Sequence, residues 1–335
     1  MITTNNMTPS GDDHKFTNLF RYEFPSTSLK LPRRRSKVMT AKKLIEQVRM
    51  GFGQGHGSNY QPWLKIRRKN PSPVSNQVVS WMPPLGRTAH YFSRGEYQLA
   101  LLLLWLGVSD LREQFPLWPI PHPHPLEGAQ GSEGLQLSWS RGLLAIADEA
   151  GIKHGVEFGT DIPYVATVDQ LATVRLSSGL KLVGFSSKAI TDPNDEVKER
   201  TLERLELERR YLNEIDAGHF VTNASMVPSL MAGQLECWLD CSTLDCAPEL
   251  LRIAYMFATN FNNRKDISIA DAVKGAANQL LIHNDEAWLL FRHCAWMQLI
   301  DIDPTKRVLT SHPANRGGLA LRSRLRQELF GEDWQ

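Results

Sequence analysis

Cysteine and long apolar runs are scarce in this sequence, and each scarcity excludes a class of protein. Four cysteines in 335 residues are too few for the disulfide framework of a small secreted domain, so we expect a reducing cytoplasm. The longest apolar run, Leu99–Leu106, is far shorter than the roughly 20 residues that cross a bilayer. The polar stretch Met1–Lys15 predicts no signal peptide. We therefore expect a protein with no membrane partner.

Acidic residues are scarce in the first 95 residues, which hold 16 Lys/Arg and 4 Asp/Glu. The rest of the chain holds 22 Lys/Arg and 32 Asp/Glu, so the net charge of +2 conceals a basic first part. A basic segment favours a polyanionic partner such as DNA, although a solvated basic tail is the alternative. The bases of Trp63–Lys69 suit phosphate contacts and a charge-protected edge strand equally. The candidate DNA-binding residues are Arg33, Arg34, Arg35, Lys65, Arg67, Arg68 and Lys69.

Hydrophobic periodicity and turn residues predict an α/β domain of the α+β kind in the middle of the chain. Helices are predicted at Ala41–Gly51, Ser93–Trp105, Ser140–Ala150 and Asn194–Ile215. Strands are predicted at Arg112–Trp118, Ile162–Val168, Leu171–Leu176 and Leu180–Ser186, the last two joined by a turn at Ser177–Gly179.

The composition changes near Val221, which suggests a second domain. Three amphipathic helices are predicted there, at Pro248–Asn260, Ser268–His283 and Asp285–Met297. A small hairpin of Leu299–Ile302 and Arg307–Thr310 would complete a winged helix, and a basic tail, Arg316–Gln327, would follow. We thus divide the chain into a basic, partly disordered arm (1–60), an α/β domain (61–220) and a winged-helix-like domain (221–335).

Two acids and a lysine occupy positions that suit metal-dependent phosphodiester hydrolysis. Mg2+ needs only one or two carboxylates in addition to substrate oxygens, and a lysine can neutralise developing negative charge. Glu96 would lie on a helix, Asp161 at the start of a strand, and Lys188 at the end of a later strand. Each also has a structural interpretation: Ser93 and Glu96 form a capping-box pattern, Asp161 suits a turn, and Lys188 suits an exposed strand end.

Three stretches resemble the TnsA family, the endonuclease subunit of heteromeric cut-and-paste DNA transposases of the Tn-seven class. The first is Ser93-Arg-Gly-Glu96 with the later Asp110-Leu-Arg-Glu-Gln-Phe-Pro-Leu117. The second is Gly159-Thr-Asp-Ile162. The third and most specific is the helix Lys198-Glu-Arg-Thr-Leu-Glu-Arg-Leu-Glu-Leu-Glu-Arg-Arg-Tyr211. Together they span roughly residues 90–220.

The resemblance implies a restriction-endonuclease-like fold of the PD-(D/E)xK type, followed by a winged helix. Carried over by position, the active site would be Glu96, Asp161 and Lys188, with Glu96 and Asp161 binding Mg2+ or, as a substitute, Mn2+. The chain would cut the 5′ strands at transposon ends. Its partners would be DNA, a DDE-type transposase subunit (TnsB-like) that cuts and joins the 3′ strands, and an AAA+ ATPase regulator (TnsC-like).

Two features depart from the family pattern. Ser186 occupies the position two residues before the lysine, where such folds usually carry Glu or Gln. The 27 residues from Asp161 to Lys188 imply an inserted hairpin, and Lys181 is the alternative lysine. Two other functions therefore stay open. One is a catalytically silent DNA-binding assembly subunit, and the other is a stand-alone restriction-type nuclease.

Overall fold

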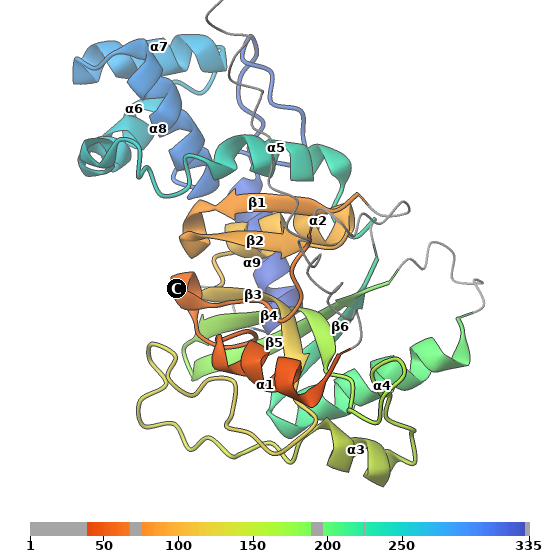
Figure 1. Cartoon of the computed structure of the whole chain (residues 1–335). Coiled ribbons are helices and arrows are strands. Elements are labelled where there is room, and N and C mark those ends of the chain that lie inside the picture. The colour runs from red at the N-terminus through yellow and green to blue at the C-terminus, as the bar shows by residue number, and fades with distance from the viewer. Residues whose placement is uncertain (1–38, 68–75, 189–196, 224, 332–335) are drawn as a thin grey trace, which may run out of the picture. The chain divides into compact units, whose positions relative to one another are not determined.

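The computed structural model describes residues 39–67, 76–188, 197–223 and 225–331 (Figure 1). Two of the predicted DNA-binding residues, Lys65 and Arg67, lie within these ranges. The other five lie outside them: Arg33, Arg34, Arg35, Arg68 and Lys69. Within the described ranges, none of the helices combines the length and apolar character that a membrane span requires.

A mixed four-stranded sheet forms the centre of the α/β part (Figure 1). Its strands are β3 (Asp110–Leu117), β4 (Ala166–Leu176), β5 (Gly179–Ser187) and β6 (Ala217–Thr222), in that order. β3 pairs with β4 and β4 with β5 in antiparallel fashion, whereas β5 and β6 are parallel. The parallel pair requires a crossover, which helix α4 (Glu199–Glu214) supplies. The predicted mixed sheet flanked by helices is confirmed.

Strand β4 is longer than the sequence pattern suggests. The two strands predicted at 162–168 and 171–176 are one strand, which begins at Ala166 and includes Asp169 and Gln170. The polar pair looks like a break, but β3 and β5 flank it and pair with Gln170 on both sides. The division into two strands was therefore wrong, because neighbouring strands satisfy a backbone that local side-chain polarity seems to interrupt.

Helices cover both faces of the sheet. Helix α2 (Arg94–Trp105) is buried along almost its whole length and shares a core with Leu111 and Ala172. Helices α3 (Leu143–Ala150) and α4 share the opposite core with Phe115 and Val168. Gly184 on β5 allows α4 to pack closely, because a Cβ atom there would overlap the Leu212 side chain. This close packing places the inner face of α4 against the end of β5.

The N-terminal part of the described chain adds elements that the sequence predicted only partly. Helix α1 (Ala41–Arg49) is confirmed, and Thr40 caps its first turn. An antiparallel hairpin of β1 (Val78–Met82) and β2 (Arg87–Tyr91) was not predicted. Short 3-10 helices lie at Gly57–Asn59 and Pro83–Leu85. The hairpin joins the same core as α2.

The C-terminal part is helical, as predicted. It contains α5 (Ser229–Leu239), a 3-10 helix (Pro248–Ile253), α6 (Ala254–Asn262), α7 (Ile269–Leu280), α8 (Asn284–Trp296) and α9 (Gly318–Phe330). The predicted wing is not present: 299–310 forms no strand. The Gln234 side chain of α5 instead bonds to the backbone of Pro304, Lys306 and Val308. Hydrogen bonds to α5 thus replace the expected cross-strand pairing.

The predicted basic tail is also wrong, because 318–330 forms α9. Arg326 is buried there, and its Nε donates to the Leu106 carbonyl at 2.8 Å. One apolar core contains side chains of α2, the β1–β2 hairpin and α5 to α8. The domain boundary placed at 220/221 remains a prediction.

Candidate active site

Glu96 lies in the first turn of α2, where its carboxylate has a capping role. The Ser93 hydroxyl accepts from the Glu96 backbone N–H at 3.1 Å and donates to Glu96 Oε1 at 3.0 Å. Glu96 Oε2 accepts from the Phe92 backbone N–H at 3.0 Å. The reciprocal bonds resemble a capping box, although the second donor is the residue before the N-cap. The prediction that Glu96 caps its own helix is therefore confirmed.

The same carboxylate also faces a second acid across an amide. Gln114 Nε2 lies 3.4 Å from Glu96 Oε2 and 3.5 Å from Asp169 Oδ1. Thr167 Oγ1 donates to Gln114 Oε1 at 3.1 Å, which directs the amide nitrogen toward the acids. The buried carboxylate of Glu96 and the half-buried carboxylate of Asp169 thus converge on one neutral donor, from helix α2 and strand β4.

A local distortion of β3 makes this convergence possible. Gln114 has φ 48°, a left-handed conformation that is uncommon for a residue other than glycine. On a regular strand Leu111 and Phe115 would share a face, but they lie in opposite cores. Ala172 and Val168, opposite them on β4, are divided in the same way. The alternation breaks at the position of Gln114 and Asp169, which frees both side chains to face Glu96.

Strand β5 holds the other side of Asp169 and ends in the predicted lysine. The Ser187 backbone N–H donates to Asp169 Oδ2 at 2.6 Å. The next residue, Lys188, donates its backbone N–H to the Thr222 carbonyl of β6 at 2.8 Å. The positive charge of Lys188 lowers the pKa of both Asp169 and Glu208, so the lysine lies near both acids. Lys181 instead donates to the Phe330 carbonyl at 3.3 Å.

Burial raises the pKa values of both acids, and the charge of Asp169 raises that of Glu96 further. Burial, followed by the charge of Asp169, raises the pKa of Glu96 to about 7 despite three hydrogen bonds that lower it. Burial also raises the pKa of Asp169, although Lys188 and the Ser187 N–H oppose the change. Such uncompensated negative charge is typical of a site that binds a cation or exchanges protons.

Helix α4 supplies a third acid that the sequence interpretation missed. Ser186 donates its hydroxyl hydrogen to Glu208 and contacts His219 Nε2 at 2.9 Å. Burial raises the pKa of Glu208, and Lys188 lowers it. A carboxylate therefore lies directly beneath the strand position where Glu or Gln was expected and Ser186 stands. Glu208 could have been found from the sequence, because it lies within the helix 198–211, the most specific of the three resembling stretches.

Asp161 does not join this cluster. It is exposed, on a loop closed by a bridge between Val156 and Pro163. Within the described ranges, no hydrogen bond or ion pair joins it to Glu96 or Lys188. The strand acid next to Glu96 is Asp169, eight residues further along the chain. The role predicted for Asp161 stays an untested prediction, and the geometry favours Asp169 for it.

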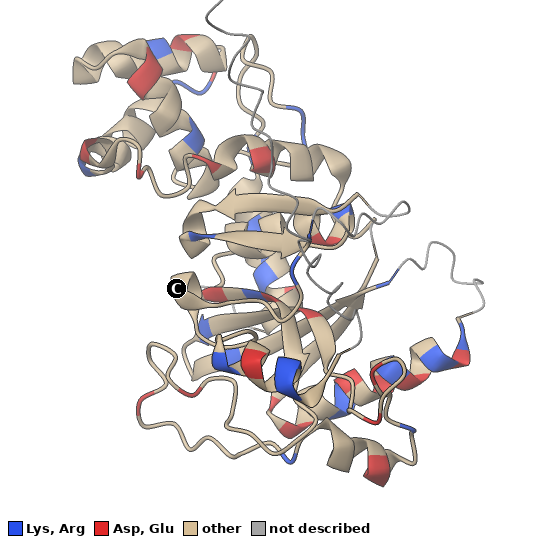
Figure 2. Cartoon of the chain, in the orientation of Figure 1, with Lys and Arg blue, Asp and Glu red and all other residues tan. Residues whose placement is uncertain are grey.

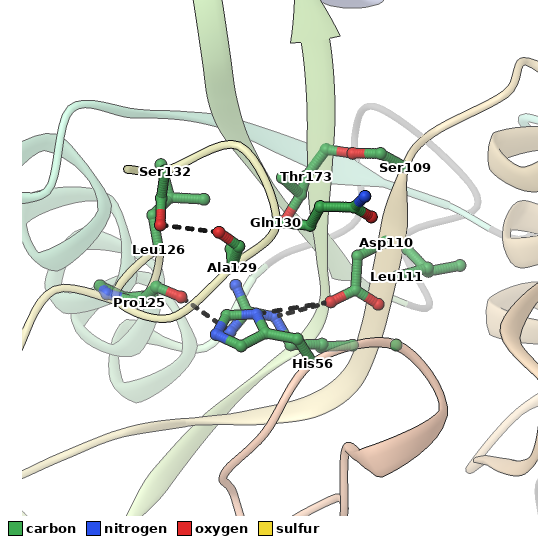
Figure 3. Close-up of polar contacts among 12 residues, drawn as sticks. His56, Ser109, Asp110, Leu111, Pro125, Leu126, Ala129, Gln130, Ser132 and Thr173 are labelled. Carbon is green, nitrogen blue, oxygen red and sulfur yellow. Dashed lines mark hydrogen bonds and ion pairs between the residues drawn. The ribbon is translucent and has the colours of Figure 1, made fainter. Parts of the chain in front are cut away.

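The charged string of β3 forms a separate polar cluster (Figure 3). Asp110 Oδ2 lies 3.8 Å from Arg112 Nε and 3.8 Å from His56 Nδ1. Arg112 Nη1 donates to the Pro125 carbonyl at 3.0 Å. Burial would raise the pKa of Asp110, but His56 and Arg112 lower it overall. These groups pair with one another.

The two described candidates for DNA contact lie on the 61–67 segment. Lys65 Nζ lies 4.6 Å from the centroid of the Phe52 ring and donates to Gln61 Oε1 at 3.3 Å. Arg67 is exposed. Neither residue is placed among the acids by a described contact, and their role in DNA binding remains a prediction.

The donor set of the acid cluster fits a hard cation. Among the described residues, no group of three His, Cys, Asp or Glu side chains is arranged to chelate an ion by itself. Mg2+ does not require such a group, because one or two carboxylates with water and substrate oxygens suffice. Glu96 and Asp169 supply two carboxylates, and Gln114 holds the space between them with a neutral amide.

Comparison with known proteins finds a similarity to a transposition protein. No family model matches it. It is 29% identical to the Transposon Tn7 transposition protein TnsA of Escherichia coli over 235 residues, which are 69% of this chain and 75% of that protein. The chain is therefore similar to this TnsA protein over about two thirds of its length.

Proposed function

We propose that this chain is the metal-dependent DNA endonuclease subunit of a transposase, and that it hydrolyses the 5′ strands at transposon ends. The observation that carries the proposal is the convergence of Glu96 and Asp169 on Gln114, with Lys188 ending the adjacent strand. The similarity to the Tn7 transposition protein TnsA supports the assignment to transposition.

The reaction is the attack of water on a DNA phosphorus atom and cleavage of its bond to a bridging oxygen, which leaves a phosphomonoester and a hydroxyl. Glu96 and Asp169 would hold Mg2+, or Mn2+ in its place. A divalent ion held there would lower the pKa of the attacking water and stabilise the leaving oxygen. Lys188 would stabilise the negative charge that develops on the phosphate oxygens.

Glu208 and Gln114 would act as positioning residues. Glu208 accepts from Ser186 and lies near the Lys188 charge, so it holds the end of β5 and restrains the lysine. Gln114 bridges the two acids and keeps them in place. An ion pair between Glu208 and Lys188 would compensate for the missing strand acid at Ser186.

The proposed partners are transposon-end DNA, a TnsB-like DDE transposase that processes the 3′ strands, and a TnsC-like AAA+ ATPase. The C-terminal region of α5 to α9 would contact the ATPase. The complex would act on the nucleoid in the cytoplasm. Ser186 favours a second candidate, a catalytically silent DNA-binding assembly subunit, because serine is a poor metal ligand.

Strand-specific nicking of end DNA by the full chain with its transposase partner tests the proposal. We expect 5′-strand cleavage in Mg2+, no cleavage in EDTA, and a loss of at least about 100-fold in the Asp169→Asn variant. The matched control is Asp161→Asn, which should cleave like the wild type. Cleavage that survives Asp169→Asn and disappears in Asp161→Asn would restore the first assignment. Absence of cleavage by the wild type in the complete assembly would favour the silent subunit.

A further inference from the structure

Helix α4 carries four arginines near the candidate active site, and one of them differs from the others. Figure 2 shows acidic and basic residues mixed along this helix. Arg200 pairs with Glu203 at 2.7 Å, and Arg209 and Arg210 both pair with Glu206 at 2.7 Å. Arg204 forms no ion pair or side-chain hydrogen bond within the described ranges. It is also exposed.

Arg204 faces the acid cluster. It precedes Glu208 by four residues, so the two side chains share one face of α4. Its charge lowers the pKa of Asp169 as well as that of Glu208. The charge of Arg204 also opposes the rise that burial causes in the pKa of Tyr164, which precedes β4. Arg204 is therefore an exposed cation on the same face of α4 as Glu208, close enough for its charge to act on the acids.

We propose that Arg204 binds a backbone phosphate of the substrate DNA beside the scissile phosphate. The inference rests on the proposed nuclease function and adds a substrate contact to it. A guanidinium group forms paired hydrogen bonds with phosphate oxygens. The other α4 arginines already direct such donors at Glu203 or Glu206.

The local charge explains why a cation is needed at this rim. Glu96, Asp169 and Glu208 lie within one small region, and Lys188 is the cation that ends the adjacent strand. DNA that approaches three acids meets repulsion unless positive charge lies at the entrance. Arg204 supplies that charge without belonging to the acid cluster itself.

Salt-dependent binding of end DNA separates this contact from catalysis. The full chain with Asp169→Asn binds without cutting, and further substitutions are made in that background. Arg204→Gln should lower affinity about tenfold or more and reduce the log–log salt slope by about 0.9. Arg209→Gln, on the same helix but paired with Glu206, is the matched control and should leave the slope unchanged. Arg204→Lys should keep the slope and recover part of the affinity.

The outcomes distinguish the two proposals. Equal slopes for Arg204→Gln and Arg209→Gln would overturn the phosphate contact, as would absence of DNA binding by the Asp169→Asn chain at low salt. Retained cleavage in Asp169→Asn alone would refute the catalytic assignment while leaving the binding result to stand. Thermal unfolding of each variant verifies that the exposed substitution has not disturbed the fold.

Discussion

Two pairs of charged side chains meet at neighbouring residues of β3, and they are built in opposite ways. Glu113 of β3 faces Arg87 of β2, whose Nη1 and Nη2 donate to its two oxygens at 2.8 and 2.6 Å. The next residue, Gln114, lies between Glu96 and Asp169, which are both acids. The first pair is neutral and fully hydrogen-bonded, whereas the second combines two like charges.

The Arg87–Glu113 pair stabilises the fold, whereas the Glu96–Asp169 pair has the charge that suits a chemical site. Burial alone would lower the pKa of Arg87, but the hydrogen bonds and charge of Glu113 raise it, so the guanidinium group stays charged. In the acid cluster burial and repulsion act in the same direction, and the pKa of Glu96 rises to about 7. A compensated pair holds β2 to β3. An uncompensated pair costs stability and persists where a cation is to be bound.

Breaking the compensated pair should give the largest loss of stability. Glu113→Gln leaves the Arg87 guanidinium buried without a countercharge, since its side chain is 7% exposed. We expect a loss of about 3–5 kcal/mol in the free energy of unfolding, measured with urea at neutral pH. The control is the double variant Arg87→Met with Glu113→Leu, which should lose less than the sum of the single changes. Additive losses would show that the two groups do not act as a pair.

The acid pair should make stability fall as pH rises. The folded pKa of Glu96, about 7, lies above its ordinary value of 4.5, so the folded state binds more protons than the unfolded state between these values. Stability is then fully present at low pH and decreases as pH rises through 7, by at most about 3 kcal/mol. Urea unfolding in EDTA across this range measures the decrease.

The Asp169→Asn variant and added Mg2+ serve as controls for this pH dependence of stability. Asp169→Asn removes the neighbouring charge that raises the pKa of Glu96, so its stability should depend less on pH than that of the wild type. Adding Mg2+ above pH 7 should stabilise the wild type more than the variant, because the ion binds only the folded site. Identical pH profiles with and without the Asp169 carboxylate would contradict the coupling of the two acids.

The smallest effect should come from the cap on α2. Ser93→Ala removes the hydroxyl that accepts from the Glu96 N–H and should cost about 0.5–2 kcal/mol, with cleavage retained. Glu96→Gln keeps an oxygen for the Phe92 N–H but removes the charge, so it should abolish cleavage at nearly unchanged stability. Loss of cleavage in Ser93→Ala, or its retention in Glu96→Gln, would mean that Glu96 serves only the cap.

Local patterns predicted much of the fold because the elements concerned depend on nearby residues. Helix α2 follows from Ser93 and a continuous apolar run, and α6, α7 and α8 follow from amphipathic spacing. The predicted wing is absent because the side chain of Gln234, far away in sequence, forms hydrogen bonds with backbone groups that a hairpin would pair. Helix α9 was not predicted, because its buried Arg326 donates a hydrogen bond to the Leu106 carbonyl, a partner that composition does not reveal.

The sequence by itself predicted Glu96 as the helix acid and Lys188 as the lysine, because Glu96 lies in the first turn of a helix and Lys188 directly follows a strand. Both assignments stay predictions, and only the tertiary structure places Asp169 beside Glu96. Asp169 looked like a polar interruption between two strands, yet β4 is continuous through it, and its neighbours Val168 and Gln170 both pair with β3. The left-handed backbone of Gln114 then brings Asp169 to Glu96. Such a placement depends on strand register and on a local break in alternation, and both arise from contacts between residues far apart in the chain.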